Sequence, residues 1–141
     1  MQLAEFIELV HRHAHRKWTA LGATVGVSYS EFEYLSAIKD QEAGKTDRDD
    51  HGQHLQDVVE DMGIRKASAS AMVVKLEARG WVRRVPCQYD ARAQHILLTE
   101  EGEDHLARGK TLYGAAARCL LAELDEAERA AIAKVWKIPH P

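Results

Sequence analysis

The chain has 141 residues, and its 19 basic and 22 acidic side chains give it a net charge of -3. This length suits a single domain, and no apolar run approaches the roughly 18 residues of a membrane-spanning helix. The N-terminus lacks the pattern of a signal peptide and the two cysteines form no CxxC motif, so we expect a cytoplasmic chain with reduced thiols and no membrane contact. No catalytic spacing stands out, so neither an enzyme nor a cofactor is expected.

The first half of the chain predicts three helices. An apolar stripe with helical spacing runs up to the glycines at 22–26 and consists of Leu3, Phe6, Ile7, Val10, Ala14 and Leu21. Residues 28–31, Ser-Tyr-Ser-Glu, form a capping box that begins the second helix. The polar stretch 40–52 predicts a long loop. The third helix is marked by Leu55, Val58, Val59 and Met62.

Residues 63–80 predict a fourth helix with two different faces. The face expected to be buried has i, i+3, i+4, i+7 spacing and consists of Ala69, Met72, Val73 and Leu76. The opposite face is small and uncharged, with Ala67, Ala71, Val74 and Ala78 flanked by Ser68, Ser70 and Lys75. Two short strands around a basic tip follow, and then another helix begins. This order is typical of a winged helix-turn-helix, whose second helix can lie against a DNA groove.

The charge is unevenly distributed along the chain. Residues 63–92 carry a net charge of +5, and the rest of the chain carries -8. Charges farther apart than a Debye length of about 8 Å are largely screened, so the local charge decides whether phosphates are attracted. The basic side chains of this stretch are Arg65, Lys66, Lys75, Arg79, Arg83, Arg84 and Arg92.

The last third of the chain predicts two more helices. Thr99 caps a long helix with an apolar stripe of Leu106, Tyr113, Leu120, Leu121 and Leu124. Asp125 and Glu128 repeat the capping-box pattern and begin a final helix with Ile132, Val135 and Trp136. The apolar stripes of the first and last helices exceed what one small core can cover, so they need a partner.

Three segments carry a family resemblance: the turn 62–64, the run Lys-Leu-Glu-Ala-Arg-Gly-Trp-Val at 75–82, and the wing sequence YDARAQHILLTEEG at 89–102. In this order they resemble the MarR family of bacterial transcription regulators. The resemblance implies a mainly α fold with a small β-wing, as one domain over 1–141. Residues 28–101 would form the winged helix-turn-helix lobe, and 1–27 and 102–141 the dimerisation helices. It further implies a homodimeric repressor that binds pseudo-palindromic double-stranded DNA and is relieved by a small-molecule effector.

The resemblance also implies which side chains meet DNA. Those expected in or beside the major groove are Lys66, Ala67, Ser68, Ser70, Ala71, Val74 and Lys75. Arg92 would enter the minor groove with Asp90 orienting it, and Arg83 or Arg84 would meet phosphates.

The chain departs from the family pattern at several of these places. Arg65 stands where a serine cap is usual, and Ala71 where an arginine or asparagine commonly reads bases. Ala93 and His95 replace the acid and arginine that often brace the wing. Direct base readout is therefore expected to be sparse, and a winged-helix module that binds protein instead of DNA remains an alternative.

The histidines and cysteines leave further alternatives open. His11 and His15 share a helical face and could hold Zn²⁺ or Ni²⁺ in a metal-responsive regulator if His51, His54 or His105 supplied a third ligand. The same residues also fit a solvated helix face without metal, which is the expectation adopted. Cys87 lies near two arginines that could activate a thiol, but a packed thiol is expected. Aromatic side chains that either line an effector pocket or fill the core are Trp18, Phe32, Tyr34 and Tyr113.

Overall fold

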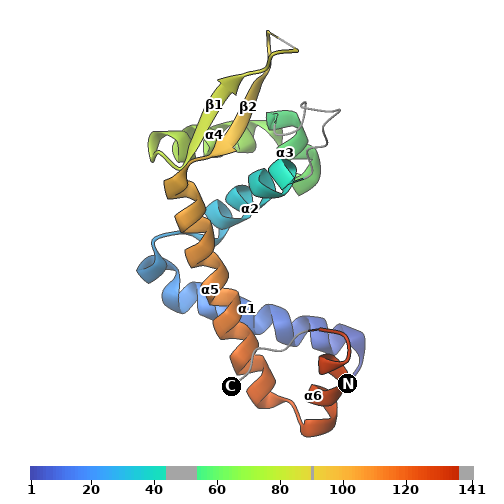
Figure 1. Cartoon of the computed structure of the whole chain (residues 1–141). Helices are drawn as coiled ribbons and strands as arrows, with labels where there is room; N and C mark the ends of the chain where they lie inside the picture. The colour runs from blue at the N-terminus through green and yellow to red at the C-terminus, as the bar shows by residue number, and fades with distance from the viewer. Residues whose placement is uncertain (44–53, 90, 137–141) are drawn as a thin grey trace.

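The computed structural model describes residues 1–43, 54–89 and 91–136 of the chain (Figure 1). Its elements in chain order are α1 (Leu3–Val25), α2 (Tyr29–Ala43), α3 (Leu55–Met62), α4 (Lys66–Ala78), β1 (Val82–Pro86), β2 (Gln94–Leu98), α5 (Glu100–Glu123) and α6 (Glu126–Ala133). Figure 1 shows α2, α3, α4 and the sheet gathered in a lobe at one end. From this lobe α5 runs to the opposite end, where it packs against α1 and leads into α6. The expected mainly α fold with a small β-wing is confirmed.

The core of the lobe is centred on α2, whose Leu35 and Ile38 are completely buried. This helix contacts α3, α4, α5 and β2, so most of the lobe is organised around it. The expected buried face of α4 is confirmed at Ala69, Val73 and Leu76, which are at most 1% exposed. Burying these side chains on one face leaves the opposite face of α4 directed to solvent.

The wing is an antiparallel hairpin, with register running from Val82 opposite Leu98 to Pro86 opposite Gln94. The inner side chains Val82, Ile96 and Leu98 are buried in the core cluster of the lobe. This burial matters because an isolated two-stranded hairpin is at best marginally stable in water.

The wing and the long helix α5 meet at Trp81. Gly80 has a φ of 76°, which a glycine adopts easily, and it turns the chain from α4 into β1. The Thr99 backbone N–H donates to the Trp81 carbonyl at 3.0 Å, and the Thr99 hydroxyl donates to the Gly80 carbonyl at 2.6 Å. A side chain at Gly102 would collide with the Trp81 carbonyl, so only glycine allows the first turn of α5 to lie this close.

An ion pair between a buried carboxylate and an exposed arginine joins the start of α2 to the end of α4. The predicted capping box is confirmed, because Ser28 and Glu31 exchange hydrogen bonds of 3.1 and 3.2 Å. The Glu31 carboxylate is buried and also accepts a hydrogen bond from the Arg79 guanidinium. Burial acts to raise the pKa of Glu31, but the hydrogen bonds from Ser28 and the charges of Arg79 and Lys75 outweigh it and hold this pKa below its ordinary value of 4.5.

The structure corrects two predicted boundaries. The stretch 40–52 was expected to be a loop, but α2 continues to Ala43, because Gln41, Glu42 and Ala43 all have a high helix propensity. Residues 44–52 lie outside the described residues. The final helix ends at Ala133, so Val135 and Trp136 follow it in a turn. The predicted caps at Thr99 and Asp125 are confirmed. In the described part of the chain, no helix combines the length and apolar character needed to cross a bilayer.

The ion pair of Glu31 makes stability depend on pH. Glu31→Gln should lower the free energy of unfolding by about 2 kcal/mol at pH 7, because Arg79 loses its buried partner. Since the folded-state pKa is lowered, this contribution is fully present above the ordinary glutamate pKa and is lost as the pH falls through the folded value. Chemical denaturation of both proteins between pH 7 and pH 3 measures the difference.

The difference in free energy of unfolding between Glu31→Gln and the unaltered chain should therefore shrink at acid pH. Glu8→Gln, a change at an exposed position of α1, is the matched control and should leave the free energy of unfolding unchanged. Equal stability of Glu31→Gln and the unaltered chain at pH 7 would show that the ion pair contributes nothing.

Candidate nucleic-acid interface

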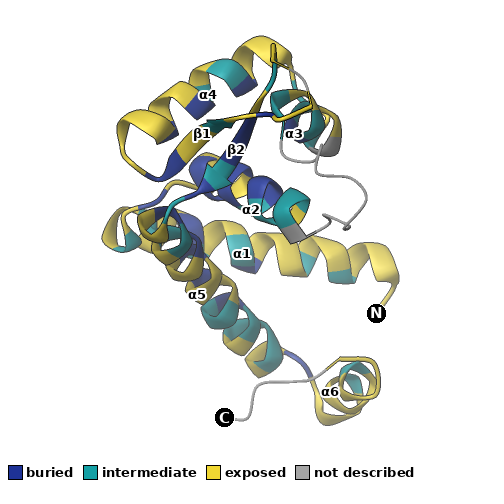
Figure 2. Ribbon diagram, turned by 45° about the horizontal axis from the view of Figure 1, so that its top comes forward, coloured by how far each residue is buried: buried dark blue, intermediate teal, exposed yellow. Residues whose placement is uncertain are grey.

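The solvent-facing side of α4 is the first part of the candidate interface. Of its predicted members, Lys66, Ala67, Ser68, Ala71, Val74 and Lys75 are exposed, and Ser70 is half-buried. Figure 2 shows this exposed face on the outer side of the lobe. Val74 is 55% exposed, so this face presents an apolar side chain to solvent. The helix begins after Arg65, whose side chain makes no capping hydrogen bond.

The wing is the second part. The sheet projects past α4 at the end of the molecule away from α1 and α6 (Figure 1), and Arg92 is exposed at its tip. Arg83 is exposed on β1. Arg84 Nε lies 3.2 Å from a carboxylate oxygen of Glu77, so this arginine is an ion-pair partner of α4. Asp90, predicted to orient Arg92, lies outside the described residues.

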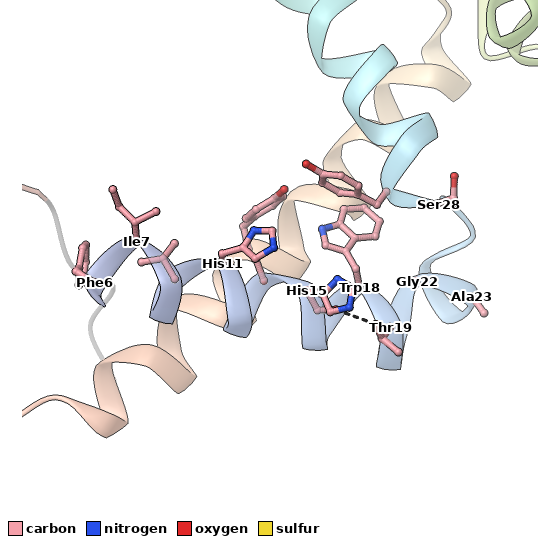
Figure 3. A pocket seen from close by; sticks show the side chains of 13 residues that line it. Phe6, Ile7, His11, His15, Trp18, Thr19, Gly22, Ala23 and Ser28 are labelled. Atoms are coloured by element: carbon pink, nitrogen blue, oxygen red, sulfur yellow. Dashed lines mark hydrogen bonds between the residues drawn. The ribbon is translucent and has the colours of Figure 1, made fainter. Parts of the chain in front are cut away.

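A cavity of about 710 Å³ lies away from this face, between α1, the start of α2 and α5. Figure 3 shows its lining along α1, from Phe6 and Ile7 to Thr19 and Ala23. Trp18 forms part of the wall, with ring centroids 5.7 Å from Tyr29 and 6.3 Å from Tyr113. A hollow of this size with mainly apolar and aromatic walls can hold a small organic molecule.

The four aromatic side chains considered from the sequence divide between cavity and core. Trp18 and Tyr113 line the cavity, whereas Phe32 packs behind them and Tyr34 is buried in the core of the lobe. Sequence reasoning missed Tyr29, which also lines the cavity. Its hydroxyl donates to Glu33 at 2.9 Å, and this hydrogen bond, with burial and the Glu33 charge, raises the pKa of Tyr29 to about 12. The sequence offered one signal for this position: Tyr29 lies one residue after the cap of α2 and three residues before Phe32, so the two rings share a helical face.

His11 and His15 of α1 line the same cavity without forming a three-ligand cluster. The rings of His11 and His15 stack with centroids 6.3 Å apart, as their i, i+4 spacing predicts. Within the described residues no third ligand group lies close to both. His105 stacks on Trp81 with a centroid distance of 3.9 Å, and His54 lies beside His95 in the lobe. His51 lies outside the described residues.

The terminal helices carry an exposed apolar surface. Its largest side chains are Met1, Leu3, Ile7, Val10, Leu21, Val135 and Trp136. Exposed fractions of 74% for Leu3 and 59% for Trp136 leave most of these two side chains in solvent. A second hollow of about 400 Å³ separates the start of α1 from α6. Leu3 and Trp136 both line this hollow, and neighbouring exposed apolar side chains of this kind are typical of an interaction site.

Comparison with known proteins identifies this arrangement. A family model described as MarR family matches residues 25–93, which run from the end of α1 to the wing. No curated protein sequence matches the chain.

Solved structures share the fold over almost the whole chain. A cysteine-to-serine mutant of MarR from E. coli is 19% identical with a TM-score of 0.74, covering 96% of this chain and 93% of that chain. The same mutant in complex with operator DNA has a TM-score of 0.66 at 19% identity, covering 94% of this chain and 89% of that chain. BpsR of Bordetella bronchiseptica, whose DNA binding is regulated by 6-hydroxynicotinic acid, is 21% identical with a TM-score of 0.62. The match covers 95% of this chain and 89% of that chain. The lobe therefore matches the MarR family model, and the fold of the solved MarR structures extends through both terminal regions of the chain.

Proposed function

We propose that this chain is a homodimeric, sequence-specific DNA-binding transcription regulator, a repressor whose binding to DNA is relieved by a small molecule. The observation that carries the proposal is the exposed α4 face, which is small and uncharged along its centre and is bordered by Lys66 and Lys75. The operator complex of MarR from E. coli, on the same fold, supports DNA as the partner.

The side chains of α4 suit close contact with a major groove. Ala67, Ala71 and Val74 would meet thymine methyl groups, and Ser68 and Ser70 would form the available hydrogen bonds to base edges. Lys66 lies in the first turn of α4, where backbone N–H groups also favour a phosphate. Specificity would depend more on apolar contacts and DNA shape than on paired hydrogen bonds, because no arginine, asparagine or glutamine lies on the exposed face between Lys66 and Lys75.

The wing would supply the second contact. Arg92 at its exposed tip would enter the adjacent minor groove, where a narrow A·T-rich groove concentrates negative potential. Asp90 is proposed to orient it through a charge-assisted hydrogen bond. Since Arg84 already pairs with Glu77, Arg83 is the better candidate for a phosphate contact from β1.

Dimerisation would use the terminal helices. A second copy of the chain would cover the exposed apolar surface of 1–27 and 102–141, which the monomer leaves in solvent. A two-fold axis there would set the two α4 helices about 34 Å apart, one turn of DNA.

The effector would bind in the cavity between α1, α2 and α5. Its volume of about 710 Å³ lies in the range of roughly 300 to 1,000 Å³ found for small-molecule sites. Aromatic walls from Trp18, Tyr29 and Tyr113 favour a small, flat, largely apolar molecule.

Selection of DNA from a random pool by the purified chain tests the proposal. We expect an enriched inverted repeat whose half-sites are about one helical turn apart, and a sedimentation mass twice the 15.8 kDa of the monomer. An unenriched pool with binding insensitive to salt would favour a module that binds protein. A monomer at micromolar concentration would remove the two-half-site arrangement.

Lys75→Ala should weaken binding to every DNA sequence by a similar factor and reduce the slope of log affinity against log salt by about one, because one phosphate contact is lost. Lys110→Ala, an exposed change on α5, is the matched control and should leave the slope unaltered. Isotherms at several salt concentrations give the slopes. A changed sequence preference at constant slope would place the Lys75 amine on a base instead.

Arg92→Ala should cost about 1 to 3 kcal/mol of DNA affinity, with the larger loss on operators that have A·T-rich flanks. Asp90→Ala should lose less, and the double variant should bind little worse than Arg92→Ala because the two side chains act together. Binding to A·T-flanked and G·C-flanked operators measures both effects, with thermal melts beside them.

Arg12→Ala on the exposed side of α1 provides the control for loss of a positive charge. Equal losses on both flanks would contradict insertion into the minor groove. A large drop in melting temperature would assign the pair a structural role.

A further inference from the structure

Three potential metal ligands that are distant in sequence meet where the tip-ward end of the wing sheet lies beside the start of α3. His54, Cys87 and His95 each direct one ligand atom into a group in which all these atoms lie within 4.8 Å of one another. Among the described residues this is the one such group of three histidine, cysteine or acidic side chains. The group is separate from the α4 face and from the cavity between α1 and α5.

Each member of the group is held by a defined element. His95 lies on β2 opposite Val85, and Cys87 follows β1, where its N–H donates to the Ala93 carbonyl at 3.1 Å. His54 is the N-cap residue of α3, and its N–H donates to Asp57 at 2.9 Å. Two ligands therefore come from the hairpin and one from the start of the helix-turn-helix.

The group is also well shielded from solvent. Cys87 and His95 are 5% and 6% exposed, and the rings of the two histidines have centroids 4.5 Å apart. Nε2 of His54 and Nδ1 of His95 are both buried nitrogens. On the other side of the His54 ring, Nδ1 lies 3.8 Å from a carboxylate oxygen of Asp57. In metal sites a carboxylate commonly accepts a hydrogen bond from the second nitrogen of a ligating histidine, and Asp57 would move closer than 3.8 Å to do so.

We propose that His54, Cys87 and His95 bind one Zn²⁺ ion, with water in the fourth position. One thiolate and two neutral imidazoles match the donor preference of zinc, and three protein ligands with one open position are a known coordination. On binding, the Cys87 thiol would release its proton to solvent and its sulfur would form the Zn–S bond, so each ion displaces one proton. In a tetrahedral site the ligand atoms lie about 3.5 Å apart. The ligand atoms now lie within 4.8 Å of one another, so binding of the ion would draw them closer together.

The ion would tie the wing to α3. The hairpin is stabilised by its buried inner face, and a metal bridge to His54 would hold it at a second point. This consequence rests on the proposed DNA binding: an ordered wing loses less conformational freedom when Arg92 meets a groove, so Zn²⁺ should strengthen binding.

The test uses the full chain without a histidine tag, freed of metal by a chelator and kept reduced. Titration with Co²⁺, which adopts the same coordination as zinc and absorbs visibly, should give one ion per chain and a thiolate-to-cobalt charge-transfer band that Zn²⁺ abolishes. Cys87→Ser should remove this band, and His54→Gln and His95→Gln should each weaken Co²⁺ binding at least tenfold. Zn²⁺ should raise the melting temperature of the unaltered chain and leave that of Cys87→Ser unchanged.

Two matched controls distinguish Co²⁺ binding at this site from binding to other cysteine or histidine side chains. Cys119→Ser, at the half-buried cysteine of α5, should keep the band, as should a chain with both His11→Gln and His15→Gln. Circular dichroism of the metal-free variants checks folding, and Cys87→Ala replaces Cys87→Ser if the latter does not fold.

Absence of the band in the folded chain would overturn the proposal, as would its survival in the Cys87 variant or its loss with the α1 histidines. The absorption result does not depend on DNA, so it stands if the chain proves to bind none. On a selected operator, Zn²⁺ should tighten binding at least fivefold for the unaltered chain and have no effect on Cys87→Ser. An unchanged affinity with the band present would remove the role in DNA binding and keep the metal site.

Discussion

Because Gly102 has no side chain, the first turn of α5 lies directly against the backbone of Trp81. This contact connects the lobe to the long helix that leads to α6. Thr99 caps α5 and also bonds to the carbonyls of Gly80 and Trp81, so the same few atoms end α4, begin the wing and begin the long helix. The Trp81 ring contacts both the Arg79 guanidinium and the His105 ring. These contacts therefore fix the direction in which α5 leaves the lobe. That direction sets the position, relative to α4, of any partner subunit bound to the terminal helices.

The lobe satisfies two opposing demands on α4. Its apolar side chains must be buried to hold the helix, while the proposed contact with a DNA groove requires the other face to remain small and exposed. The ion pair of Arg79 with Glu31 fixes the end of α4 without using that exposed face. Arg84 and Glu77 likewise connect the wing to α4 at its side. Anchoring contacts and proposed DNA contacts therefore involve different side chains of one short helix.

The sequence predicted the helices, caps and hairpin because each depends on residues close together in the chain. Ser28 and Glu31, Thr99, Asp125 and the apolar face of α4 are local patterns of this kind. What could not be predicted depends on distant segments meeting. His54 was considered as a partner of the α1 histidines, and nothing local to Cys87 indicates that α3 begins beside it. The proximity of Cys87 to His95 alone could have been inferred from the hairpin register.

The first turn of α2 belongs both to the cavity and to the anchor of α4. Ser28 and Tyr29 line the cavity, and Glu31, one residue beyond Ser30, holds Arg79 while its backbone N–H donates to the Ser28 hydroxyl. A molecule that displaces Ser28 would disrupt the cap and alter the hold of Glu31 on Arg79. Such a link acts equally in both directions. A bound operator that favours the present position of α4 would lower the affinity of the cavity for that molecule by the same factor by which the molecule weakens operator binding.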